Sequence, residues 1–138
     1  MSRKAREPVQ KRAIRTRRKL LAAARQCFSR RGFHGTRMDE VARRAHVNKE
    51  RIYAYFRSKQ GLFSAVLQEA FQEVTEAERV FLALPDGDVP VLAERLLGHY
   101  LRFHAEHPHF WRLLSWENLE GGGQLNGLSE IRQAAFRR

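Results

Sequence analysis

The stretch from Thr36 to Phe56 constrains the fold most, because it contains two short amphipathic segments with too few residues between them for a structured loop. Thr36 and Asp39 fit a capping box, and the apolar residues after them recur at helical spacing: Met38, Val41, Ala42 and Ala45. Asn48 is a good N-cap for a second helix, in which Ile52 and Phe56 share one face. This pattern predicts a helix-turn-helix, a unit that reads DNA.

Positive charge is concentrated in the same part of the chain. Residues 1–59 carry 19 Lys and Arg against 4 Asp and Glu, a net charge of +15, whereas residues 60–138 carry 7 against 11, a net charge of −4. Basic side chains neutralise phosphates, so this asymmetry is typical of a nucleic-acid-binding half joined to a half that binds something else. A solvated basic face is the alternative, and coincidence with the helix-turn-helix pattern favours DNA.

Length and composition limit the rest of the architecture. A chain of 138 residues with 43% hydrophobic content can bury one core, or a small head that shares a helix with a second bundle. Cys27 is the only cysteine, so no internal disulfide can form, and its position beside Phe28 favours packing over redox sensing. No apolar run approaches the roughly 20 residues that span a bilayer, and no signal-peptide pattern is present. We therefore expect a cytoplasmic, nucleoid-associated protein without a membrane partner.

Three regions are predicted along the chain: a flexible basic arm over residues 1–9, a helix-turn-helix DNA-binding domain over residues 10–58, and a helical effector-binding and dimerisation domain over residues 59–138. The arm has no hydrophobic periodicity and is interrupted by Pro8. Its basic side chains fit two interpretations, contact with an adjacent minor groove or simple solvation: Arg3, Lys4 and Arg6.

Hydrophobic spacing predicts helices on both sides of the helix-turn-helix. A first helix over about residues 10–31 is followed by Gly32, at a position where a left-handed C-cap residue belongs. Ser58 can cap a long fourth helix, whose apolar set continues to Leu84 before a break at residues 85–87.

Three more helices are predicted further along, over about residues 91–104, from Pro108 to Gly121, and over about residues 125–135. No strand-like alternation is present. We therefore predict an all-α fold, in which an N-terminal three-helix helix-turn-helix head is joined by the long fourth helix to a helical ligand-binding and dimerisation bundle.

The third helix is predicted to turn one face away from Ile52 and Phe56, with Ala54 at its centre. A small residue there allows close approach to a groove. Arg51 can make bidentate hydrogen bonds to guanine, whereas Lys49 can contact either a base or a phosphate. Arg51 is therefore the residue expected to determine sequence specificity.

The remaining candidates position the protein on the duplex. Tyr53 and Tyr55 can reach phosphates on the two walls of the major groove, and a phosphate partner would explain a cation at Lys59, near the start of a helix. Glu50 can accept a hydrogen bond from cytosine, although we favour a role in complementing the helix dipole, and Thr36 can either cap its helix or donate to a phosphate. The full set of predicted DNA-binding residues is Thr36, Arg37, Lys49, Glu50, Arg51, Tyr53, Tyr55 and Lys59.

A longer set of residues extends over about Thr16 to Leu67: Leu20 to Ala24, Phe28, Gly32, Phe33, Thr36, Val41, Ala42, Ala45, Val47 to Lys49, Ile52, Tyr53, Tyr55, Phe56, Ser58 and Lys59. This set resembles the N-terminal domain of TetR/AcrR-family transcriptional regulators. The resemblance implies a homodimeric repressor, released by a small ligand, that places its third helix in the major groove of a palindromic operator. It also implies DNA contacts at Lys49, Arg51, Tyr53, Tyr55 and Lys59.

The sequence departs from the family pattern in two places. His46 stands in the turn where the family usually has Gly, and a left-handed conformation costs a non-Gly residue on the order of 1 kcal/mol. Family members also run some tens of residues further and pair through their last two helices. This sequence ends at Arg138, so we expect a partial second domain.

Aromatic residues in the second half could line a cavity for an apolar or aromatic effector: Phe71, Tyr100, Phe103, Trp111 and Trp116. Core packing is the favoured interpretation for any one of them. His104 and His107 lie three residues apart, but Pro108 interrupts the helix that would align them, so we predict no metal site.

No motif for catalysis or for a cofactor is present, since the sequence lacks a GxSxG elbow, a P-loop lysine and an HExxH pair. The predicted function is therefore DNA-binding transcriptional regulation without a cofactor, with double-stranded DNA, a small-molecule effector and a second copy of the chain as partners. The alternative is a helical protein that binds nucleic acid or an anionic surface without sequence preference.

Overall fold

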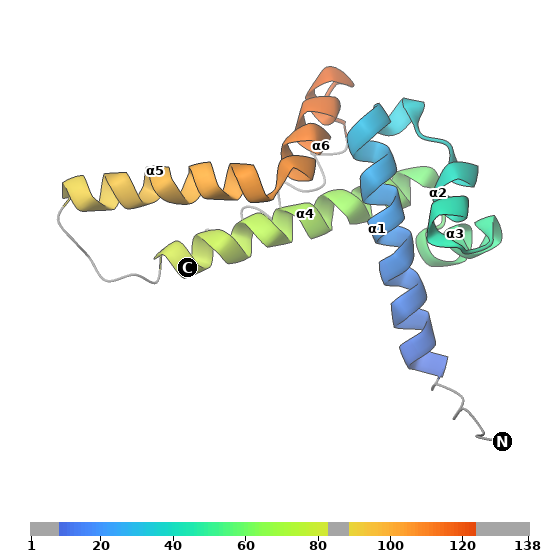
Figure 1. Ribbon diagram of the computed structural model, residues 1–138. Coiled ribbons are helices and arrows are strands. Elements are labelled where there is room, and N and C mark those ends of the chain that lie inside the picture. The colour runs from blue at the N-terminus through green and yellow to red at the C-terminus, as the bar shows by residue number, and fades with distance from the viewer. Residues whose placement is uncertain (1–8, 83–88, 124–138) are drawn as a thin grey trace. The chain divides into compact units, whose positions relative to one another are not determined.

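The computed structural model describes residues 9–82 and 89–123, and every regular element within these ranges is a helix (Figure 1). The all-α prediction is therefore confirmed. The chain divides into two compact units, with the boundary between Ala65 and Val66 inside the fourth helix. None of the described helices is long and apolar enough to cross a bilayer.

The first helix, α1, spans Val9–Gly35 and buries one face in the head, including Leu20, Ala24 and Phe28. The described residues begin at Val9, so the predicted arm and its basic side chains lie almost entirely outside them. Cys27 is also buried, as the packing interpretation requires, and burial raises the pKa of its thiol.

A kink interrupts α1 at Gly32, where φ is 68° and ψ is −174°. The positive φ matches the predicted left-handed backbone, but this ψ belongs to a region that only glycine occupies readily. At the kink the Thr36 hydroxyl donates a hydrogen bond to the Gly32 carbonyl at 2.8 Å. Thr36 is buried, with 1% of its surface exposed.

The second helix, α2, spans Met38–Ala45 and buries the predicted stripe of Met38, Val41, Ala42 and Ala45. Its N-cap is Arg37, without a side-chain capping bond, so the predicted capping box of Thr36 and Asp39 is wrong. The reason lies at the kink in α1, because the Gly32 carbonyl there accepts the hydrogen bond of the hydroxyl that the capping box required.

The turn between α2 and the third helix confirms the expectation for His46, which adopts a left-handed conformation with φ 53° and ψ 45°. The N–H groups of His46 and Val47 donate back to the carbonyls of Arg43 and Ala42, at 3.2 and 3.0 Å. These two bonds satisfy carbonyls at the end of α2. The left-handed His46 therefore belongs to the C-terminal cap of α2.

The third helix, α3, spans Lys49–Phe56 with Asn48 at the predicted N-cap position, although the Asn48 side chain makes no capping bond. Ile52 is fully buried and Phe56 nearly so. The fourth helix, α4, spans Lys59–Leu82. As predicted, Ser58 caps it, because its hydroxyl oxygen accepts a hydrogen bond from the Gly61 N–H at 2.9 Å.

Aromatic rings close the core of the head. The ring of Phe63 on α4 lies 4.8 Å from the ring of Phe28 and 5.4 Å from that of Phe33. Edge-on and offset contacts of this kind add to the stabilisation from burial.

The second unit contains the rest of α4 with α5, Val89–Glu106, and α6, Pro108–Leu119. Phe110 on α6 contacts the rings of Phe71 and Phe103, at 5.4 and 5.9 Å between centroids. As predicted, α6 starts at Pro108, and Gly121 with its positive φ of 96° follows its end. The predicted break at residues 85–87 and the predicted helix over residues 125–135 lie outside the described residues.

Most of the large apolar side chains of α5 are exposed. Leu97 and Leu101 show 61% and 64% of their surface to solvent, and their neighbours on the helix are also exposed: Val91, Leu92, Leu96 and Tyr100. Exposed apolar side chains in this number are typical of a surface that another element covers.

Replacing Gly61 by Ala should destabilise the head, because the added Cβ would overlap the carbonyl oxygen of Phe56. We expect Gly61→Ala to lower the free energy of unfolding by about 1–3 kcal/mol, measured by chemical denaturation. Gly98→Ala is the matched control, since its Cβ would meet open space, and it should be neutral or stabilising by about 0.5–1 kcal/mol. Equal effects of the two substitutions would contradict the proposed close contact.

Candidate nucleic-acid interface

The face of α3 opposite Ile52 carries most of the predicted DNA-binding side chains. Glu50, Arg51 and Ala54 are exposed, and Tyr53 shows 42% of its surface. Two further candidates, Lys49 and Tyr55, are half-buried on the shoulders of this face. A short helix that is fixed on one side and open on the other has the geometry of an element that enters a groove.

Lys49 is paired with Asp39, a residue that the sequence analysis had assigned to capping. The Lys49 Nζ lies 2.9 Å from the Asp39 Oδ1. The hydrogen bond and charge of Asp39 raise the pKa of Lys49, with smaller effects from neighbouring groups. The pair joins the first turn of α2 to the first turn of α3, so a phosphate would compete with Asp39 for the same ammonium group.

Lys59 does not depend on a phosphate to explain its place at the start of α4. Its Nζ lies 4.8 Å from the centre of the Phe33 ring, a distance suited to a cation–π interaction. The Arg17 guanidinium lies 5.5 Å from the ring of Phe56 in the same way. This second contact holds α1 against the C-terminal end of α3.

Thr36 is not available to a phosphate in this structure, because its side chain is buried and its hydroxyl is bonded to Gly32. Arg37, the next residue, is exposed and lines a surface hollow of about 590 Å³. The charged residues Arg31, Asp39, Glu40 and Arg43 line the same hollow. Of the two candidates before α2, only Arg37 therefore presents its side chain to solvent.

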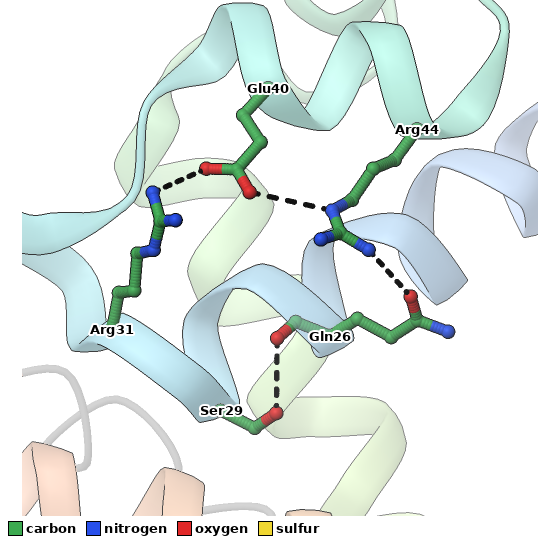
Figure 2. Close-up of polar contacts among 5 residues, drawn as sticks. All are labelled: Gln26, Ser29, Arg31, Glu40 and Arg44. Carbon is green, nitrogen blue, oxygen red and sulfur yellow. Dashed lines mark hydrogen bonds and ion pairs between the residues drawn. The ribbon is translucent and has the colours of Figure 1, made fainter.

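Glu40 ties α2 to α1 through a cluster that the sequence analysis missed (Figure 2). Its carboxylate accepts a hydrogen bond from Arg31 at 2.9 Å and a longer one from Arg44 at 3.4 Å. Arg44 also donates to the side-chain oxygen of Gln26 at 3.4 Å. The Ser29 hydroxyl donates to the backbone carbonyl of Gln26 at 3.2 Å. The carboxylate is 12% exposed, so this link is partly shielded from water.

The predicted pocket residues differ in their environment. Phe71 and Phe103 pack against Phe110, whereas the ring of Tyr100 is exposed and its hydroxyl donates to Glu78 at 3.3 Å. Two tryptophans complete the set and are half-buried: Trp111 and Trp116. The structure thus brings Phe71 and Phe103 together and leaves Tyr100 outside their packing.

Trp111 has an unusual polar atom. Its ring stacks on His104 at 4.8 Å, and its indole Nε1 is buried with no hydrogen-bond partner. A buried donor without an acceptor is costly, so it marks a place where an acceptor could be supplied. No group of three potential metal-ligating side chains occurs within residues 9–82 and 89–123.

Comparison with known proteins decides the family. The family described as "Bacterial regulatory proteins, tetR family" matches residues 20–66. A TetR-like transcriptional regulator from Rhodococcus sp. RHA1 has a solved structure that is 30% identical, with a TM-score of 0.74 over 94% of this chain and 67% of that one. This chain belongs to the TetR family.

Two curated TetR-family relatives are named as transcriptional repressors. The HTH-type repressor SCO4008 of Streptomyces coelicolor is 35% identical over 78% of this chain and 52% of its own length. The HTH-type repressor NicS of Pseudomonas putida is 37% identical over 80% of this chain and 51% of its own length. The chain thus spans about half the length of these relatives, which are named as regulators and not as enzymes.

Removing the charge of Glu40 should loosen the contact between α1 and α2 in this TetR-family head. We expect Glu40→Gln to lower the free energy of unfolding by up to about 1 kcal/mol, because both arginine partners are partly exposed and screened by solvent. Urea denaturation measures the change.

Glu76→Gln is the control for that measurement. Glu76 pairs with Arg79 at 2.8 Å, but both side chains are well exposed and lie on the same helix. This substitution should leave the unfolding curve unchanged. An equal loss in the two variants would mean that Glu40 does not link the helices.

Proposed function

We propose that this chain is a sequence-specific DNA-binding transcriptional regulator, a ligand-released repressor that acts as a homodimer on a palindromic operator in the cytoplasm, at the nucleoid. The single observation that carries the proposal is the third helix: α3 is fixed by Ile52 and Phe56, while its other face offers polar and basic side chains. The net charge of +15 over residues 1–59 supplies the attraction to phosphates. Residues 10–58 are proposed as the DNA-binding domain and residues 59–138 as the start of the effector and dimerisation domain.

In this proposal α3 enters the major groove. Arg51 reads guanine through two parallel hydrogen bonds, and Ala54 permits close approach. Tyr53 and Tyr55 bind phosphates on either side and fix the register of the helix. Lys59 can keep its contact with the Phe33 ring while its remaining donors face a phosphate.

A homodimer is supported by the size of the reading element. An α3 of 8 residues is about 12 Å long, which corresponds to only three or four base pairs of groove. Two copies on a palindrome would double the number of bases that are read. The exposed apolar side chains of α5, Leu97 and Leu101 most of all, are consistent with a second domain that is covered by further protein.

A small-molecule effector is supported by the second unit. The rings of Phe71, Phe103 and Phe110 offer an apolar environment, and the buried Nε1 of Trp111 lacks an acceptor. We therefore propose an apolar or aromatic effector with a hydrogen-bond acceptor. Displacement of the DNA by such a ligand would need a difference in ligand affinity between two conformations of the protein.

Binding to nucleic acid without sequence preference is the alternative, and the same basic charge would support it. The two functions differ in one measurable ratio. A sequence-specific regulator binds its promoter fragment more tightly than a scrambled duplex at near-physiological salt, whereas the alternative predicts equal affinities.

Truncating Arg51 should remove most of the sequence preference. We expect Arg51→Ala to reduce the difference in binding free energy between the promoter fragment and a scrambled duplex by about 1–3 kcal/mol, and to abolish footprint protection of the palindrome. Arg51→Lys keeps the charge but loses the planar fork, so it should restore affinity for both duplexes without restoring the preference.

Arg95→Ala is the matched control for Arg51→Ala, since Arg95 is an exposed arginine on α5. It should leave the preference and the footprint unchanged. If Arg51→Ala keeps the wild-type ratio, Arg51 does not read bases, and α3 does not specify the operator as proposed.

Removing the competing carboxylate at Asp39 should strengthen binding. We expect Asp39→Asn to raise the affinity for every duplex and to steepen its salt dependence by about one unit of slope, because Lys49 becomes free to neutralise a phosphate. Fluorescence anisotropy over a series of salt concentrations measures both quantities. In a Lys49→Ala background the same substitution should have little effect. Weaker binding by Asp39→Asn would instead mean that Asp39 orients Lys49 productively.

A further inference from the structure

The first turns of α1 present a basic face to solvent on the side away from the head. Lys11, Arg15, Arg18 and Lys19 line a shallow surface hollow of about 500 Å³ together with Ile14 and Ala22. At 100° per residue, the first three of these basic residues lie opposite the buried Leu20 and Ala24. This set of six residues is called the α1 basic face below.

These turns are not covered by the rest of the head. Figure 1 shows the N-terminal part of α1, in blue, projecting beyond α2 and α3. Val9 and Ile14 accordingly expose 85% and 54% of their surface. The helix is thus longer than its packing against the other head helices requires.

Like charges lie close together along the α1 basic face. No Asp or Glu occurs between Val9 and Arg37, and the first turn of α1 has no acidic residue to complement the helix dipole. The pairs Lys11 with Arg15 and Arg15 with Lys19 have an i,i+4 spacing, at which like charges repel by about 0.2–0.5 kcal/mol. An anionic partner that contacts several of these side chains would reduce this repulsion.

We propose that the α1 basic face binds phosphates of double-stranded DNA outside the bases read by α3, and so anchors the head without regard to sequence. This inference rests on the proposed function, and the four basic residues of the face all lie before Leu20, where the match to the TetR family begins. Residues 9–19 of α1 span about 15 Å, enough to face several phosphates of a duplex. The Arg17 contact with Phe56 keeps these turns fixed relative to α3.

Other occupants fit the α1 basic face less well. A second copy of the same face would bring like charges together. A membrane-binding helix needs a broad apolar side, and the large apolar residues exposed on residues 9–19 are only Val9 and Ile14. DNA needs only the charges that are present.

The test uses the full chain with two substitutions, Lys11→Gln and Arg18→Gln. Since each phosphate contact contributes about 0.9 to the slope of log affinity against log salt, we expect the slope to fall by about 2. The affinity for the promoter fragment and for a scrambled duplex should fall by the same factor, so their ratio stays at the wild-type value. Removal of like charges should leave the melting temperature equal or higher, which separates lost contacts from unfolding.

Arg95→Gln with Arg102→Gln is the matched control, because it removes two exposed positive charges from α5. A wild-type slope in the α1 variant, or an equal fall in the control, would overturn the proposal. So would a loss of binding to phosphatidylserine vesicles by the α1 variant with DNA binding unchanged. If the wild-type protein shows no sequence preference but the α1 variant still lowers the slope, the proposed function fails while the phosphate-binding face stands.

Discussion

The structure of the head depends on the burial of Ile52 and Phe56. A helix of 8 residues is too short to be stable alone in water, so α3 exists because these two side chains leave solvent. Burying each contributes about 1.5–3 kcal/mol. The same burial determines which side chains stay outside, because rotating α3 by one residue would expose Ile52 and bury Arg51 or Tyr53. The burial that stabilises α3 therefore also determines which of its side chains can contact DNA.

The turn before α3 fixes the position of α3 relative to α2. His46 takes a left-handed conformation at a cost on the order of 1 kcal/mol, and the hydrogen bonds from His46 and Val47 to the end of α2 offset that cost. On the other side of α2, Glu40 links it to Arg31 on α1. The short helices are thus held at both ends, which gives a rigid support for a surface that must match a groove.

The sequence predicted the helices of the head well, because their buried residues recur with a 3.6-residue period, as Met38 and Val41 do in α2. It failed where a side chain's partner is set by tertiary structure. Thr36 fits a capping box locally, but the kink at Gly32 supplies a carbonyl that takes its hydroxyl. Asp39 and Lys49 are ten residues apart, a separation at which no helical periodicity signals a contact.

The charges of the head are arranged in two different ways, and this distinguishes structural cations from those that need a partner. Arg17 and Lys59 lie over aromatic rings, and Arg31 contacts Glu40, so the folded head itself stabilises these cations. Lys11 and Arg18 instead lie on a helix that carries no Asp or Glu from Val9 to Gly35, where each added cation raises the electrostatic energy of the free protein. Any polyanion that binds the folded head relieves that energy and stabilises the fold by mass action. The basic side chains on α1 therefore make the stability of the folded head depend on whether a polyanion is bound.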